Sequence, residues 1–405
     1  MSLRINPFNY SGTNLRHLTD LYPLPISKQA QIINDLSVPS SKNLFSKRSL
    51  PVKAQVLKNG ITLVSQKIPH VYSGALNIIV NVGSVSEDEQ NNGITHFIEH
   101  MVFKRTKTRD AKQIAEEAGN VGCDLNAFTD KDLTAFEVTL LGENILVPIE
   151  LFLDMLLNTK LNSKDFGLEK QVILEEIKRY EDAPESQIHS VSENTYWAGH
   201  PMGRPILGTN KTVSEMDKDM LKDFLAKHYI PSNMIVSVAG DFDLDAVIKK
   251  IEEFRPKTNL EKQKTEISPP TINPAIFVQN KNTEQAHFCF NTKGYTLHDE
   301  DRHILAVLKT ALGGTSSSRL YLEIREKRGL VYTIHSYMPN YNTCGALTIY
   351  GGTNPKNFSK AMSLILSEIK KLKKTGFTDG ELNRAKTQLK TNSLLKQEST
   401  DSKSF

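Results

Sequence analysis

The order of predicted strands and helices occurs twice along this chain, and this repetition limits the folds that the chain can adopt. Residues 51–253 read as a first unit and residues 274–405 as a second. Residues 254–273 between them are charged and contain three prolines, a composition typical of a linker. A chain of 405 residues also exceeds what one hydrophobic core usually supports. We therefore expect two domains of similar outline, preceded by a polar extension at residues 1–50.

The two units differ at their C-terminal ends. Laying Leu161 on Phe377 aligns them so that Glu176 falls on Asn392. The first unit continues beyond Glu176 with a predicted helix and strand up to Gly240, whereas few residues follow Asn392 in the second. We therefore expect the second domain to end differently or to be truncated. A missing strand would leave an open sheet edge, which is a liability for stability.

Hydrophobic periodicity predicts the secondary structure of both units. Asn59-Gly60 indicates a hairpin turn, and Asp110 and Gly119 are expected to cap and to end a helix. In the first unit we expect two strands within 52–66, a strand at 74–85, helices at 94–103 and 110–118, strands at 123–129 and 133–141, helices at 147–157, 164–180 and 217–228, and a strand at 233–239. In the second we expect strands at 275–278 and 285–292, a helix at 301–312, a strand at 343–350, and helices at 355–375 and 379–395.

The predicted helix at 94–103 carries the sequence His-x-x-Glu-His. His96 and His100 are four residues apart, so they project from the same face of the helix, with Glu99 beside them. Two imidazoles one turn apart suit a tetrahedral metal such as zinc. A carboxylate that does not bind the metal can take a proton from a metal-activated water. This is the inverzincin pattern; the alternative is an amphipathic helix with surface or capped histidines.

The predicted helix at 164–180 carries several acids. Glu169 and Glu176 are seven residues apart, or two turns, and therefore share a face, whereas Glu175 points elsewhere. The second unit has no His-x-x-Glu-His, and Asn392 takes the place of Glu176 in it. A metal constellation is therefore expected in the first unit alone.

The composition excludes several classes of protein. A net charge of +4, with charged residues at 24%, does not call for nucleic acid or an anionic membrane as a partner. Cys123, Cys289 and Cys344 are too few and too far apart for a disulfide framework and fit a reducing compartment. No apolar run is long enough for a transmembrane helix, and the N-terminus lacks the apolar region of a secretory signal.

Four separated segments resemble the M16 zinc metallopeptidases. The most similar branch is the processing-peptidase-like one, which includes the β subunit of mitochondrial processing peptidase and its bacterial relatives. The resemblance runs from about Val52 to the C-terminus. The segments are GITHFIEHMVFK, VGCDLNAFTDKDLTAF, EKQVILEEIKRYEDAPE and SSRLYLEIREKRGLVYTIHSY.

The resemblance implies two homologous α/β (α+β) domains, each a sheet packed with helices, that face each other like a clam. It implies one Zn²⁺ per chain, bound by His96, His100 and a distal glutamate, with Glu99 as the general base. The family register and the face shared with Glu169 favour Glu176 over Glu175 as the distal ligand. Glu169 would support the site from behind; otherwise it is a surface carboxylate.

The resemblance also assigns residues to substrate binding. Asn126 and Ala127 match the strand to which an extended peptide adds by backbone hydrogen bonds; without the family, Asn126 would simply be a turn residue. Arg325 and Tyr332 match a pair that the second domain contributes to the substrate and transition state. Without the family, Arg325 would be a solvated helix residue and Tyr332 part of the core, and Arg328 is an alternative to Arg325.

These expectations describe a zinc endopeptidase that cleaves unfolded peptides or protein presequences. The alternative is a non-catalytic structural or assembly subunit of an M16-type complex. Glu181, Asp182 and Glu185 could form an acidic pocket for a basic substrate residue, or a solvated loop. A monomer, a homodimer and a pair with an M16 partner subunit all remain open. The expected compartment is the bacterial cytoplasm, with the mitochondrial matrix as the alternative.

Overall fold

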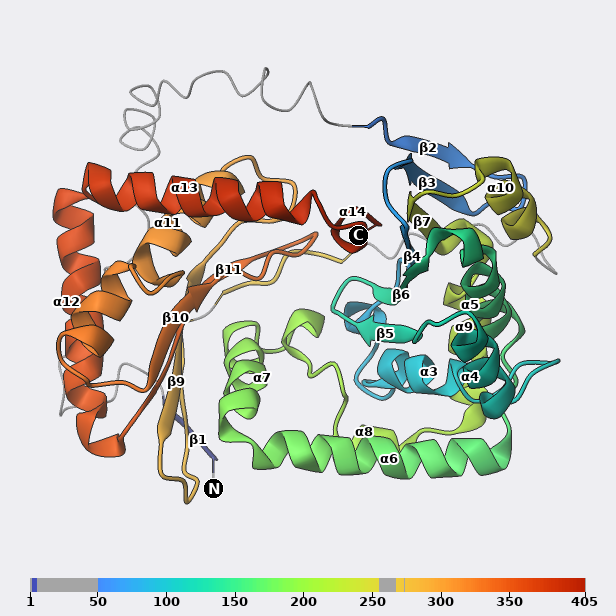
Figure 1. Cartoon of the computed structure of the whole chain (residues 1–405). Coiled ribbons are helices and arrows are strands. Elements are labelled where there is room, and N and C mark those ends of the chain that lie inside the picture. The colour runs from blue at the N-terminus through green and yellow to red at the C-terminus, as the bar shows by residue number, and fades with distance from the viewer. Residues whose placement is uncertain (1, 6–49, 255–266, 273, 405) are drawn as a thin grey trace.

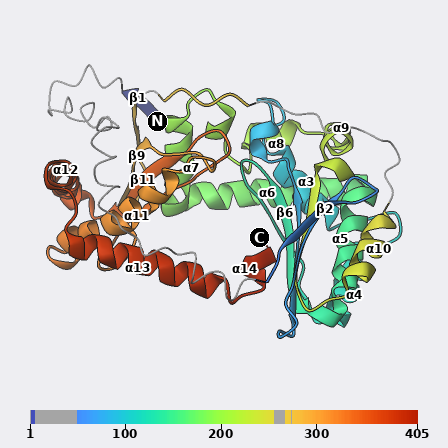
Figure 2. The ribbon, with the colours of Figure 1, turned by 90° about the horizontal axis from the view of Figure 1, so that it is seen from above.

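The computed structural model describes residues 2–5, 50–254, 267–272 and 274–404. Two mixed α/β halves lie side by side, and the helices that leave the first half reach the second (Figures 1 and 2). Most of the expected N-terminal extension at 1–50 and of the expected linker at 254–273 lies outside the described residues. Among the helices that the structure describes, none is long and apolar enough to cross a membrane.

A six-stranded sheet forms the centre of the first half, in the order β2-β3-β7-β4-β6-β5. All neighbouring strands are antiparallel except β3 and β7. The short strands β2 and β5 are the two edges. The bounds are β2 Lys53–Val56, β3 Thr62–Lys67, β4 Ser73–Val80, β5 Asn126–Thr129, β6 Thr134–Leu141 and β7 Met234–Gly240.

Helices cover one face of this sheet. Alternate residues of the central strand β4, Leu76, Ile78 and Val80, join a continuous core with apolar residues of the helices, as a half-covered strand requires. The helices of this half are α3 Ile94–Val102, α4 Ala111–Asn120, α5 Leu146–Asn158, α6 Ser163–Asp182, α8 Asn210–Glu215, α9 Lys218–His228 and α10 Leu244–Glu252.

The second half repeats this plan on a smaller scale. Its sheet has the order β10-β11-β9, so these strands correspond to β5, β6 and β4. Within the described residues β9 has a partner on one side only, and no counterpart of α9 or β7 follows α13. The elements are β9 Ala286–Lys293, α11 Arg302–Gly313, a π-helix Tyr321–Glu326, β10 Thr333–Tyr337, β11 Ala346–Thr353, α12 Phe358–Thr375 and α13 Asp379–Lys396.

Three segments connect the halves or lie outside the two sheets. Helix α7, Pro184–Tyr196, continues from α6 and packs against β9 (Figure 1). The short helix α14, Asp401–Ser404, lies against β4 of the first half, where the Asn77 side-chain amide donates to Ser404 Oγ at 2.8 Å. Strand β1, Ser2–Ile5, pairs with β8, Ile276–Gln279. The second half therefore ends by crossing to the first.

Several predicted boundaries are wrong. The strand predicted at 74–85 ends at Val80, because Ser84–Ser86 form a 3-10 turn whose first amide bonds to the β5–β6 turn. The helix predicted to end before Gly119 continues to Asn120, and the left-handed glycine is Gly122. The strand predicted from Cys123 begins at Asn126, and the one predicted at 343–350 occupies Ala346–Thr353. The predictions also missed α7, α8, α10 and β10.

An ion pair secures α13 to the second half. Arg319 donates to both carboxylate oxygens of Glu381, at 2.8 and 2.7 Å, and stacks over Phe377. The hydrogen bonds from Arg319 hold the pKa of Glu381 at about 2. Glu381 also accepts from the backbone N–H of Thr378, the residue that caps α13. The pair therefore links the start of α13 to the π-helix segment.

We predict that Glu381→Gln lowers the stability of the protein by about 1–3 kcal/mol at pH 7, the usual contribution of a charge-assisted hydrogen bond. Because folding lowers the pKa of Glu381 from about 4.3, its contribution is present above pH 5 and is lost between about pH 5 and 2. Urea unfolding at pH 7 and pH 3, followed by circular dichroism, measures the difference. The exposed pair of Lys112 and Glu116 supplies the control Glu116→Gln, expected to cost less than about 1 kcal/mol. Equal losses for both variants at pH 7 would contradict the prediction.

Candidate metal centre

The candidate site begins with the way in which α3 starts. Glu87 is buried, and its carboxylate accepts hydrogen bonds from the backbone N–H groups of Gly93 and Thr95, at 2.8 and 2.9 Å. These N–H groups lack partners within the helix, so the carboxylate replaces a side-chain cap. Gly93 has φ of 97°, and a Cβ there would lie 2.7 Å from the carbonyl oxygen of Leu207, so glycine is required. Burial raises the pKa of Glu87 to about 7, although its hydrogen bonds oppose the shift.

His96, His100 and Glu176 converge between α3 and α6. Glu176 Oε2 lies 3.8 Å from His96 Nε2 and 3.7 Å from His100 Nε2. Among the residues that the structure describes, this is the one group of three whose potential ligand atoms are close enough to share a metal ion. Glu175, the alternative ligand, is exposed on another face of α6.

This set of donors fits zinc. Burial, together with the neighbouring His100, lowers the pKa of His96 to about 3, so its imidazole is neutral and can act as a ligand. Two ligand atoms at about 2.1 Å from a tetrahedral zinc ion would be about 3.4 Å apart, close to the separations here. Two imidazole nitrogens and one carboxylate leave a fourth position open, as in catalytic zinc sites.

A buried carboxylate supports the site from behind. Glu169 Oε2 lies 3.1 Å from His100 Nδ1, and its other oxygen pairs with Lys104 Nζ at 2.7 Å. A hydrogen bond from Nδ1 to Glu169 leaves His100 Nε2 free to face the shared metal position. His96 Nδ1 is buried without a hydrogen-bond partner in the described part of the chain, so His96 lacks such support.

Glu99 lies beside the group and is held by the edge strand. The hydroxyl of Thr129, at the end of β5, donates to Glu99 Oε2 at 2.6 Å. Burial raises the pKa of Glu99 and Glu176 adds to the shift, while Thr129 and His100 oppose it. A raised pKa brings a carboxylate closer to the range useful for a general base at neutral pH.

The expected substrate residues lie on the exposed edge strand. Asn126 is exposed, and its amide donates to Glu137 Oε1 of β6 at 3.0 Å. Ala127 is half-buried against the core of the first half. Since β6 occupies one side of β5, the backbone of the other side has no partner strand among the described residues.

The structure does not bring the second-half residues to this group. Arg325 is exposed, hydrogen-bonds the hydroxyl of Tyr321 and lies over its ring at 4.9 Å. Tyr332 is 56% exposed, so its interpretation as a core residue is wrong. Arg328 pairs with Glu323 at 2.9 Å. In the part of the chain that the structure describes, neither Arg325 nor Tyr332 hydrogen-bonds the candidate metal group.

Sequence reasoning missed the partners of the metal group. No role was predicted for Glu87 from the sequence, although an acid shortly before a helix is a capping signal. Lys104 lies one turn beyond His100, and Thr129 lies two residues after Ala127. These short spacings could have indicated that Lys104 and Thr129 lie near the candidate site. The contacts that they make join segments far apart in the sequence, which periodicity alone cannot pair.

Comparison with known proteins agrees with this arrangement. Residues 62–210 match the model "Insulinase (Peptidase family M16)", and residues 215–389 match "Peptidase M16 inactive domain". A relative from Bacillus subtilis, "Uncharacterized zinc protease YmxG", is 36% identical over 87% of this chain and 86% of its own. An uncharacterized zinc protease of Streptomyces coelicolor is 34% identical over 86% of this chain and 78% of its own.

Solved structures share the fold. A protease from Helicobacter pylori aligns with a TM-score of 0.81 at 23% identity, over 87% of both chains. A structure titled as a peptidase M16 inactive domain, from Pseudomonas fluorescens, aligns with a TM-score of 0.76 at 20% identity, over 84% of this chain and 83% of its own. Both halves are thus accounted for by one family. From these matches the chain belongs to peptidase family M16.

Proposed function

We propose that this protein is a zinc-dependent endopeptidase that hydrolyses unfolded peptides or protein presequences. The observation that carries the proposal is the convergence of His96, His100 and Glu176, with the carboxylate of Glu99 beside them. The names of the relatives as zinc proteases support it. One zinc ion per chain, held by these three side chains, would supply Lewis-acid activation of the attacking water and of the peptide carbonyl.

The chain's own residues then move the proton. Glu99 takes a proton from the attacking water and later returns it to the leaving amine. The Thr129 hydroxyl occupies Glu99 Oε2 and leaves Oε1 for the water. Burial makes the carboxylate more basic, which favours proton uptake. Glu169 and Lys104 hold His100 in place while this happens.

The edge strand β5 is the proposed substrate platform. An extended peptide would pair with its outer side through backbone hydrogen bonds, which are largely independent of sequence. Asn126 and Ala127 lie on this strand, and Asn126 is exposed enough to reach the peptide backbone. Because a folded protein rarely offers a free extended segment, this mode favours unfolded substrates. Two roles are considered for the acids Glu181, Asp182 and Glu185: a site for a basic substrate residue, or a solvated surface.

The second half is proposed to complete the site on closure. Arg325 and Tyr332 are exposed donors that can bind a carbonyl oxygen as it gains negative charge. Arg325 would have to leave Tyr321 to do so. One chain carries both the metal group and this pair, so a monomer or a homodimer would suffice, and a separate M16 partner subunit is the alternative.

The competing proposal is a non-catalytic assembly subunit. The chain keeps two histidines, the distal glutamate and a candidate base in one place, which a structural role does not require. Zinc content separates the proposals at the first step. A well-folded protein that binds no zinc would favour the assembly subunit.

We predict that Glu176→Gln lowers zinc binding by at least 10-fold, whereas Glu175→Gln leaves it near one ion per chain. The two residues are neighbours on α6, but only Glu176 lies near both imidazoles. Loss of one ligand of three should weaken binding strongly. Zinc content after dialysis against a weak chelator measures both variants. If Glu175→Gln lost zinc and Glu176→Gln kept it, the assignment of the distal ligand would be wrong.

We predict that Glu99→Gln retains zinc but cleaves a quenched, arginine-containing unfolded peptide at least 10²–10⁴-fold more slowly, the usual contribution of a general base. A strong chelator should also abolish wild-type cleavage, and added zinc should restore it. The matched control is Glu175→Gln, at an exposed acid on another face of α6. Cleavage by Glu99→Gln at the wild-type rate would remove Glu99 from the mechanism.

A further inference from the structure

The buried cation Lys131 has no part in the mechanism described above. It lies in the turn between β5 and β6 and is 1% exposed, although lysine is rarely buried unless it is paired. Its ammonium group donates to the carbonyl oxygen of Arg204 at 2.6 Å and pairs with Glu193 Oε2 at 3.1 Å. A charge held in this way fixes the position of the turn, because displacing it would leave a buried charge unpaired.

The turn is also clamped through its backbone. The carbonyl oxygens of Asp130 and Lys131 accept from the N–H groups of Ser84 and Val85, at 3.1 and 3.0 Å. A Cβ at Gly83 would lie only 2.3 Å from the Lys131 carbonyl oxygen, so the close approach depends on glycine. These contacts place the turn against the loop that leads to Glu87.

The same turn determines where β5 ends. Thr129, whose hydroxyl holds Glu99, lies two residues before Lys131. The Arg204 guanidinium donates to the carbonyl oxygen of Glu87 at 2.5 Å, and Glu87 caps α3. A short chain of contacts through Lys131 and Arg204 therefore joins the substrate strand to the start of the metal-binding helix.

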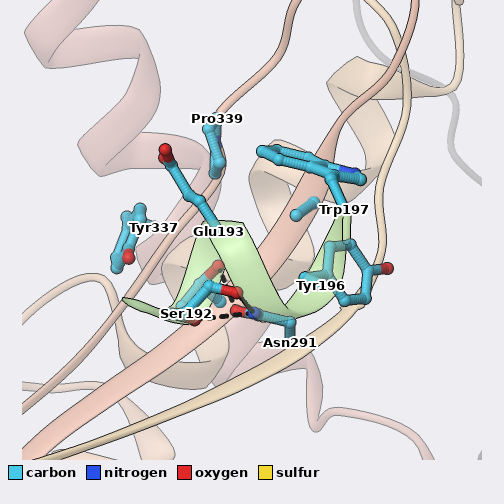
Figure 3. A pocket seen from close by; sticks show the side chains of 9 residues that line it. Ser192, Glu193, Tyr196, Trp197, Asn291, Tyr337 and Pro339 are labelled. Carbon is cyan, nitrogen blue, oxygen red and sulfur yellow. Dashed lines mark hydrogen bonds between the residues drawn. The ribbon is translucent and has the colours of Figure 1, made fainter. Parts of the chain in front are cut away.

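The turn contacts the second half as well. Asp132 Oδ2 accepts from the backbone N–H of Asn342 at 2.7 Å. Glu193, the partner of Lys131, lies on α7, which packs against the sheet of the second half (Figure 3). Beside Glu193, Ser192 Oγ accepts from the Asn291 amide at 2.7 Å, the contact that Figure 3 draws between α7 and β9.

We propose that Lys131 is a positioning residue that couples the packing of the second half to the edge strand β5 and, through Thr129, to Glu99. The role of Glu99 in this statement rests on the proposed function, but the coupling itself does not. When α7 and the second half are in place, Glu193 and Asn342 hold the turn, and the turn holds β5 in register with β6. Movement of the second half would loosen β5 and release Glu99 from Thr129.

Hydrogen–deuterium exchange of zinc-loaded full-length protein tests this coupling. We expect Lys131→Met to accelerate exchange in residues 125–136 by about 10-fold or more, which corresponds to about 1.4 kcal/mol of local stability. Helix α5, in the core of the same half, should exchange at the wild-type rate. Lys131→Arg, which keeps the charge and the donors, should restore most of the protection. Lys112→Met is the matched control, because Lys112 is 81% exposed and, among the residues that the structure describes, forms its one ion pair with Glu116 on its own helix.

Glu193→Gln provides a second variant if Lys131→Met does not fold. Glu193 is part-exposed, so its loss should be tolerated, and we expect faster exchange in the same segment by about 3-fold. If Lys131→Met or Glu193→Gln exchanged in residues 125–136 like Lys112→Met, or if α5 loosened equally, the coupling would be refuted.

Peptide cleavage then gives a separate readout. We expect Lys131→Met to lower kcat per zinc-loaded molecule by about 10-fold, with Lys131→Arg close to wild type. If wild-type protein does not cleave peptides, the proposed function fails while the exchange experiment still decides the coupling. If exchange changes as expected but kcat does not, the link from the turn to Glu99 is refuted.

Discussion

The packing of α3 against α6 is the contact on which the candidate site depends. Neither helix contains a complete ligand set, since α3 supplies His96 and His100 and α6 supplies Glu176. Phe97 of α3 stacks on Phe166 of α6 at 4.9 Å between ring centroids. Apolar packing therefore sets the separation of the helices, and this separation determines the distances between the candidate ligand atoms. A structure held in this way can present three ligands at short range before any metal binds.

The carboxylates around this helix pair are distinguished by their surroundings. Glu87 accepts backbone N–H groups at the start of α3, Glu169 faces His100 and Lys104, and Glu99 receives one hydroxyl. Burial favours the neutral form of a carboxyl group, whereas donors and cations favour the charged form. Burial raises the pKa of Glu99, and the hydroxyl of Thr129 opposes this shift. Burial also raises the pKa of Glu87, although that carboxylate accepts several hydrogen bonds. The same type of side chain is therefore a cap at Glu87, a support at Glu169 and the proposed base at Glu99.

Local patterns predicted the parts of the fold and of the site that depend on short spacings. His96, Glu99 and His100 lie on one helix, and the two-turn spacing of Glu169 and Glu176 correctly placed both acids toward it. Helix α7 and strand β10 have weaker periodicity and were missed, since α7 has no fully buried residue. Thr129, Lys104 and Lys131 act through contacts between distant segments. Only the tertiary structure defines those contacts.

The edge strand β5 is held in part by contacts between its turn and the second half. A four-residue strand paired on one side has little intrinsic stability. Its pairing with β6 sets its register, and contacts to its turn support that register. The turn is bound by the loop after β4, by Arg204, by α7 and by Asn342 of the second half. Two of these four supports, α7 and Asn342, belong to or pack against the second half. A first half alone would keep the histidines on α3 but would hold β5, and with it Thr129 and Glu99, less firmly.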